Sequence, residues 1–175
     1  IPRPSMLNPR PPSCRGCPLD DKATGFVAPE GPVNAPILLL GEAPGPDEVR
    51  AGRPFVGAAG SMLSRLLSLL GRSRDQFRIA NVVQCCPPKL WLEGAPWQFG
   101  AIEHCRVHRD PVLAEPHQVL VPLGSVALKT TLGLLGAKKV RIADFHGTVP
   151  PLPSGQLVVP TFHPRFLQRG AHNLL

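Results

Sequence analysis

The sequence contains no apolar stretch long enough to cross a lipid bilayer. Its longest apolar runs, such as residues 36–40, are far shorter than the ~20 residues that a membrane-spanning helix requires. No charged–apolar–small signal peptide opens the chain, and its first residue is Ile rather than Met. These absences predict an intracellular, cytoplasmic protein without a membrane partner, whose start has been trimmed or processed.

Acidic residues are scarce, since 12 Asp and Glu stand against 19 Lys and Arg, and the formal net charge is +7. This balance is compatible with a polyanionic partner, because phosphate binding releases counterions, but charge alone does not establish one. The 43% share of apolar residues excludes a disordered charged tail. We expect one monomeric domain over residues 1–175, with residues 1–13 forming a proline-rich, extended N-terminal arm.

Four short apolar runs predict buried strands, and their near-continuous apolarity is typical of a parallel sheet covered on both faces. Helices are predicted over residues 101–113 and 125–135, and where Met62, Leu63, Leu66, Leu67 and Leu70 recur at helical spacing. This alternation indicates the α/β class, as a three-layer α/β/α sandwich with a central, mainly parallel four-stranded sheet. Residues 138–155 predict a short strand or a loop. The predicted strands cover residues 35–40, 77–83, 118–123 and 157–161.

The most unusual residues follow the predicted strands. In open parallel sheets, functional sites form beyond the carboxyl ends of the strands. Core packing alone does not account for such a convergence, so these ends are the candidate site. The segments concerned are residues 41–45, 81–88, 124–125 and 163–164.

Two glycine-rich segments come first along the chain. In residues 41–45 (Gly-Glu-Ala-Pro-Gly), the glycines and the proline predict a sharp turn that lets the backbone approach a ligand, and Glu42 could orient or activate a water. In residues 52–60 (Gly-Arg-Pro-Phe-Val-Gly-Ala-Ala-Gly), Phe55 could stack on a planar base. Taken singly, an ordinary turn with a solvated Glu and a core Phe beside a helix start explain these segments as well.

Together with the acidic pair Asp47-Glu48, these segments resemble the signature of family 4 uracil-DNA glycosylases. The other motifs of that family follow in order, and the resemblance runs from about Cys14 to Arg169. It implies a DNA repair enzyme that hydrolyses the N-glycosidic bond of uracil in DNA and leaves an abasic site. Those motifs are residues 14–17 (Cys-Arg-Gly-Cys), residues 81–88 (Asn-Val-Val-Gln-Cys-Cys-Pro-Pro), Cys105 and His163-Pro164.

Two other functions stay open at this point. One is a glycosylase for a broader range of deaminated bases, although Glu42 favours strict uracil specificity. The other is a non-catalytic, cluster-stabilised nucleic-acid-binding domain. The joint presence of Glu42, Asn81 and His163 favours the enzyme, because DNA binding alone requires no such set of polar side chains.

The chain has five cysteines, and the absence of an export signal favours metal or cluster ligation over disulfides. The resemblance implies that Cys14, Cys17, Cys85 and Cys105 hold a [4Fe–4S] cluster, with Cys86 as the spare thiol. Spacing alone does not separate this cluster from a tetrahedral zinc site with the same ligands.

The resemblance also implies roles at a uracil pocket. His163, neutral or cationic, would donate to an oxygen of the leaving base. The amide of Asn81 would match N3–H and O4 of uracil and refuse cytosine, which presents the opposite pattern. Phe55 would stack on the ring and Gly41 would border it. Glu42 would position the water or stabilise the sugar cation.

The expected partner is uracil-containing DNA, single- or double-stranded, which places the protein with the nucleoid. Gly124-Ser125 opens a predicted helix whose free N–H groups could bind a phosphate. Arg165 could bind the DNA backbone. Phe166 or Leu167 could wedge into the vacated base stack, or could simply anchor the last helix. Arg72, Arg74 and Arg78 are expected to be solvated surface residues.

Overall fold

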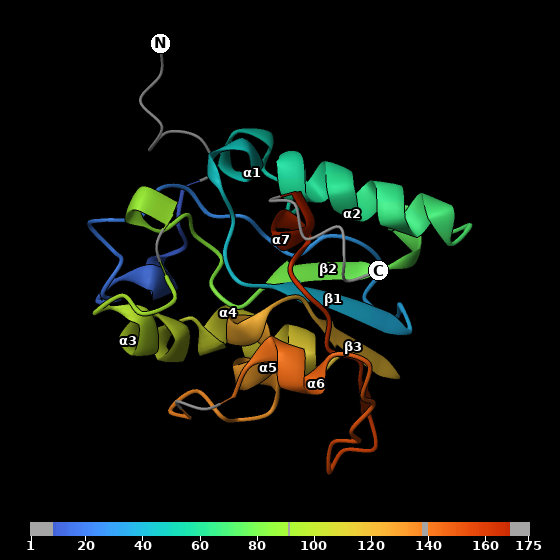
Figure 1. The fold of residues 1–175 in the computed structure, drawn as a ribbon. Coiled ribbons are helices and arrows are strands. Elements are labelled where there is room, and N and C mark those ends of the chain that lie inside the picture. The colour runs from blue at the N-terminus through green and yellow to red at the C-terminus, as the bar shows by residue number, and fades with distance from the viewer. Residues whose placement is uncertain (1–8, 91, 138–139, 169–175) are drawn as a thin grey trace.

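The computed structural model describes residues 9–90, 92–137 and 140–168, and it is built on a four-stranded, all-parallel sheet (Figure 1). The strand order is β2-β1-β3-β4, so β1 lies between strands that follow it in sequence. Gly41 pairs with Asn81 and Leu40 with Pro122, which brings the carboxyl ends of three strands to one edge. The strands are β1 (Ile37–Gly41), β2 (Arg78–Asn81), β3 (Val119–Pro122) and β4 (Leu157–Val158).

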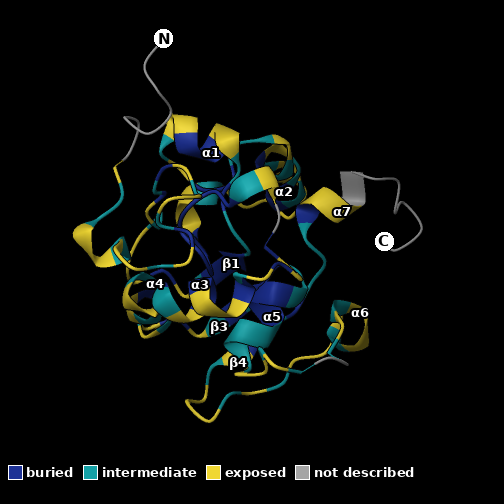
Figure 2. Cartoon of the chain, turned by 90° about the vertical axis from the view of Figure 1, so that its left-hand side faces the viewer, coloured by how far each residue is buried: buried dark blue, intermediate teal, exposed yellow. Residues whose placement is uncertain are grey.

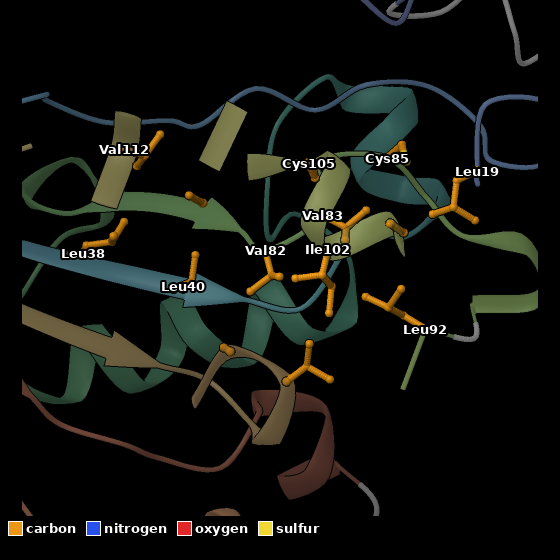
Figure 3. Packing of buried hydrophobic residues seen from close by; sticks show 14 of the residues in the cluster. Leu19, Leu38, Leu40, Val82, Val83, Cys85, Leu92, Ile102, Cys105 and Val112 are labelled. Atoms are coloured by element: carbon orange, nitrogen blue, oxygen red, sulfur yellow. The ribbon is translucent and has the colours of Figure 1, made fainter. Parts of the chain in front are cut away.

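The two faces of the sheet pack against different helices, because side chains alternate along each strand. Leu38 and Leu40 belong to the larger core cluster, which α3 (Gln98–His104), α4 (Arg106–Leu113) and α5 (Ser125–Thr131) complete (Figure 3). Leu39 points to the opposite face and packs with Leu63 and Leu67 of α2 (Ala58–Leu69). Figure 1 shows the sheet between these helices, which confirms the predicted α/β sandwich.

The predicted helices are shorter or divided in the structure. The helix expected over residues 101–113 is two helices, because the first ends at His104 and Cys105 separates it from α4. The helix expected over residues 125–135 ends at Thr131. Residues 138–155, expected to form a strand or a loop, include the single-turn helix α6 (Ile142–Phe145). Two further helices, α1 (Pro46–Ala51) and α7 (Pro164–Gln168), lie beside the candidate site.

Short 3-10 turns complete the described elements, and buried residues concentrate in the strands and the inward faces of the helices (Figure 2). Residues 1–8 of the predicted arm lie outside the described residues. The rest of that arm is tied down, because Arg10 donates a 2.6 Å hydrogen bond to the carbonyl of Leu19. None of the helices within the described ranges is long and apolar enough to cross a membrane. The 3-10 turns are η2 (Pro12–Cys14), η3 (Arg74–Gln76) and η4 (Pro88–Leu90).

Candidate active site and cysteine cluster

A pocket of about 480 Å³ lies at the carboxyl ends of β1 and β2, and the predicted polar residues line it together. Glu42 follows β1, Asn81 ends β2, and His163 precedes α7. Phe55 comes from the loop between α1 and α2. All four side chains line this one pocket, although they are separated by up to 121 positions (163 − 42) in the sequence.

Gly41 does not itself line this pocket, but it lets two of the lining side chains lie close together. A Cβ atom at Gly41 would lie 2.4 Å from Oδ1 of Asn81 and 2.5 Å from Cζ of Phe55. Both distances are far shorter than normal contacts, so any side chain here would push the amide and the ring apart. Asn81 is 4% exposed and Phe55 is 5% exposed, so neither can easily move aside. Gly41 therefore brings Asn81 and Phe55 together.

Phe55 has a backbone conformation that non-glycine residues rarely adopt. Its φ is 51°, in the left-handed region. Its ring stacks on the ring of His163, with centroids 5.7 Å apart and an interplanar angle of 29°. A Cβ atom on Gly60 would lie 1.8 Å from the carbonyl oxygen of Phe55, so the start of α2 also accommodates this loop through a glycine.

His163 is held as a neutral imidazole of defined tautomer. Burial lowers its pKa to about 4, and the positive charge of Arg165 contributes, while the negative charge of Glu48 opposes the shift. The backbone N–H of Arg165 donates a 3.2 Å hydrogen bond to Nδ1 of His163. Nδ1 is thus the acceptor, and Nε2 carries the hydrogen of the neutral ring.

Glu42 lies in an environment that favours its protonated form. Burial raises the pKa of Glu42, and the negative charge of Glu93 raises it further. The backbone N–H of Glu93 and the positive charge of Arg165 oppose this rise. The carboxyl group of Glu42, which lines the pocket, therefore becomes protonated at a higher pH than that of an ordinary glutamate.

Glu48 organises the pocket walls, a role that the sequence analysis missed. Its carboxylate accepts hydrogen bonds from the backbone N–H groups of Gly45 (3.0 Å), Val56 (3.1 Å) and Gly57 (2.9 Å). Glu48 thus joins the turn after β1 to the loop that carries Phe55. A signal was present, because two glycine-rich turns leave backbone donors unpaired and an acidic residue stands between them.

Only some of the predicted DNA-contacting residues line the pocket. Arg165 and Phe166 are exposed and line the same pocket, and Phe166 stacks on Phe162 at 5.1 Å. Gly124 and Ser125 do not line the pocket, and the backbone N–H of Gly124 already donates to the carbonyl of Thr161. Gly124 instead packs beside His163: a Cβ atom added to Gly124 would lie 3.3 Å from the Cβ atom of His163. The side chain of Leu167 lies outside the described residues.

A second cavity is lined by the four predicted cysteine ligands, Cys14, Cys17, Cys85 and Cys105. Cys86 does not line this cavity and lies in a small cluster with Val27 and Val49. All five cysteines are free thiols. In the described part of the chain, no three His, Cys, Asp or Glu side chains are arranged to hold a single metal ion.

The deeper pair of these thiols is strongly biased toward the protonated form. Burial raises the pKa of Cys85 to about 12 and that of Cys105 to about 11, and the other cysteines of the cavity add to both shifts. A bound cationic group would reverse this bias, because coordination removes the thiol proton. His108 borders the cavity with its Nε2 atom 3.5 Å from Sγ of Cys14.

A family model described as "Uracil DNA glycosylase superfamily" matches residues 28–174. The chain belongs to the uracil DNA glycosylase superfamily. This membership confirms the resemblance that the motifs indicated, and the matched range contains every residue that lines the pocket.

Curated members of the superfamily are similar to this chain over most of its length. A type-4 uracil-DNA glycosylase of Thermotoga maritima is 35% identical over 170 residues, covering 97% of this chain and 85% of the relative. A type-4 enzyme of Pyrobaculum aerophilum is 35% identical, covering 77% and 67%. A type-5 uracil-DNA glycosylase of Thermus thermophilus is also 35% identical, covering 79% and 67%.

Proposed function

We propose that this chain hydrolyses the N-glycosidic bond between uracil and deoxyribose in DNA and leaves an abasic site. The observation that carries the proposal is the single pocket lined by Glu42, Phe55, Asn81 and His163. The target base must leave the base stack to reach such a pocket. Its volume of about 480 Å³ leaves room for the attached sugar as well as a pyrimidine.

Asn81 and Phe55 select the base in this proposal. A primary amide donates and accepts at once, so Asn81 can accept from N3–H of uracil and donate to O4. Cytosine presents an acceptor and a donor in the reverse order and leaves the same amide unpaired, which costs binding energy. The Phe55 ring stacks on the base, and its burial beside Gly41 holds it close to the amide.

His163 and Glu42 act on the bond that breaks. As the bond lengthens, negative charge builds on the uracil and positive charge on the sugar. The Nε2–H of His163 donates to the uracil oxygen where that charge develops, and its neutral form is maintained by burial. In this proposal Glu42, which lines the same pocket, acts on the sugar side, where a carboxylate orients the attacking water and stabilises the positive sugar.

A [4Fe–4S] cluster held by Cys14, Cys17, Cys85 and Cys105 is the proposed cofactor. The four cysteines line one cavity, and this shared lining, together with the family resemblance, is what supports the cluster in this proposal. When bound, the cluster would cross-link the N-terminal segment to the residues after β2 and to the end of α3.

Duplex or single-stranded DNA containing uracil is the proposed partner. Arg165 and Phe166 project from the rim of the pocket into solvent, which supports contacts with the DNA backbone and with the vacated stack. Because the N–H of Gly124 already donates to the carbonyl of Thr161, it is not offered to a phosphate, and only Ser125 at the start of α5 stays a proposed phosphate contact. Leu167 stays a proposed second wedge residue. The net charge of +7 supports binding to the phosphate backbone.

An excision assay on defined oligonucleotides tests the proposal. The protein is incubated with otherwise identical strands that contain uracil, hypoxanthine or thymine, and abasic products are then cleaved with alkali. We expect strand breaks with uracil alone. Cleavage of the hypoxanthine strand at a similar rate would instead indicate a broader deaminated-base glycosylase. Binding without any cleavage would indicate a non-catalytic module.

A further inference from the structure

We propose that Arg74 is a positioning residue that holds Phe55 in the conformation required for the base pocket. The inference rests on the proposed function, because it gives a role to a residue outside the pocket through the residue that stacks on the base. The sequence analysis expected Arg74 to be a solvated surface residue. The structure corrects this, since its side chain is only 18% exposed and every described contact it makes points inward.

Two edges of the Arg74 guanidinium group bind two different partners. One edge, formed by Nε and Nη2, binds both carboxylate oxygens of Glu30 at 3.1 and 3.2 Å. The other edge turns to the loop before α2, where Nη1 donates to the carbonyl of Phe55 at 2.5 Å and Nη2 donates to the carbonyl of Pro54. Such a planar fork is specific to arginine, because a lysine ammonium cannot bind two edges at once.

Glu30 is itself fixed to the sheet. Its backbone exchanges two hydrogen bonds with Ile79 of β2, at 2.9 and 2.8 Å, and its carboxylate also binds Arg53 at 2.8 Å. Partial burial raises the pKa of Glu30, but hydrogen bonds from Arg53 and Arg74 outweigh this and lower it to about 2. Glu30 thus stays an anion at physiological pH and connects β2, through Arg74, to the carbonyl of Phe55.

One anchored carbonyl belongs to Phe55, whose conformation needs support, and the other belongs to Pro54 just before it. Phe55 has its φ at 51°, and a non-glycine residue in this region persists only where its surroundings impose it. Its ring stacks on His163 and reaches the space beside Gly41, next to the amide of Asn81. Release of the two carbonyls would let the loop relax. The ring of Phe55, which borders His163 and Asn81, would then move.

A double-mutant cycle tests whether Arg74 acts through Phe55. Single-turnover excision rates on a uracil oligonucleotide are measured for the wild type, Arg74→Gln, Phe55→Ala and the double variant. We expect Arg74→Gln alone to slow excision by between about 10-fold and 100-fold, as expected of a misplacement of about 1 Å, with unchanged affinity for the DNA. In the Phe55→Ala background, Arg74→Gln should cause no further loss.

Arg78 provides a matched control. Its side chain is 13% exposed, binds both carboxylate oxygens of Glu115 at 2.8 Å and donates to the carbonyl of Gly31, but it lies at the start of β2, away from the pocket. Arg78→Gln should lower the melting temperature as Arg74→Gln does, while its excision rate at a temperature where both are folded stays near that of the wild type.

Three results would overturn the inference. The first is that Arg74→Gln lowers the excision rate by the same factor in the wild-type and the Phe55→Ala backgrounds. The second is that Arg78→Gln lowers the excision rate as much as Arg74→Gln does. The third is that weaker DNA binding accounts for the whole rate loss of Arg74→Gln. If Arg74→Gln does not fold, Arg74→Lys replaces it in the cycle with the same expectation, because lysine keeps the charge beside Glu30 but not the fork. Uracil excision by the wild type tests the proposed function separately, so either idea can fail alone.

Discussion

The backbone N–H of Arg165 donates a 3.2 Å hydrogen bond to Nδ1 of His163. Because Pro164 lies between them at the start of α7, the first turn of this helix determines which ring nitrogen carries hydrogen. Nε2 is left to carry the hydrogen of this pocket-lining residue, while burial keeps the ring uncharged. A hydrogen bond within three residues thus prepares a neutral donor, as the proposed role of His163 at the leaving base requires.

The neutral state of His163 predicts a specific pH dependence. The pKa of His163 is lowered to about 4 from 6.5, so the ring stays neutral at every pH well above 4 and becomes cationic only below it. Single-turnover excision should therefore not fall as the pH rises from about 6 to 8. A mechanism that needs the imidazolium would lose rate as the pH rises through this range, and a rate profile with that slope would contradict our account.

Glu42 is expected to set the acid limb of the same profile. Its pKa is raised above 4.5, so the carboxylate is lost at a higher pH than for an ordinary glutamate. Wild-type excision should fall as the pH decreases through that raised pKa. Glu42→Gln should be slow at all pH values and should lack this limb. A Glu42→Gln profile parallel to that of the wild type would assign the acid limb to another group.

The two adjacent cysteines give a matched pair for the cluster. Cys85 lines the four-cysteine cavity, whereas Cys86 packs with Val27 and Val49. We expect the purified protein to be brown and to contain iron, and Cys85→Ser to lose both colour and iron while Cys86→Ser keeps them. Colourless wild-type protein with stoichiometric zinc, or iron loss in Cys86→Ser alone, would refute the ligand set.

Phe166 is expected to act on duplex DNA. It is 44% exposed at the rim of the pocket, which favours a wedge over an anchor in the core. Phe166→Ala should slow excision from a duplex more than from a single strand, because only the duplex has a stack to hold open. Phe99→Ala, also at an exposed phenylalanine but on α3, is the control. Equal losses on both substrates would favour the anchor.

The residues at the strand ends could be placed from the sequence because parallel strands bring their carboxyl ends to one edge. Gly41 and Asn81 are register partners, so their apolar strands alone predict that they meet. The strand pattern also indicated His163, which follows the fourth predicted strand, whereas Phe55 comes from a loop and was indicated by the family resemblance.

Glu48 and Arg74 were beyond the sequence analysis for a physical reason. Both bind backbone groups of loops, and the positions of those groups depend on the tertiary fold rather than on any residue spacing. The division of the helix at Cys105 escaped prediction as well, since its side chain belongs to the cysteine cavity and the helical pattern around it is continuous. The missed features therefore follow from loop geometry and from the cysteine cavity rather than from hydrophobic periodicity.

The most direct measurement is single-turnover excision of uracil by Asn81→Ala and His163→Ala, with the affinity of each variant for the same oligonucleotide measured in parallel. We expect each variant to lose most of the excision rate and still to bind the DNA. For His163→Ala, which removes the proposed oxyanion donor, the expected loss is about 100-fold or more. Wild-type rates in either variant would contradict the assignment of this pocket as the place where uracil is read and released.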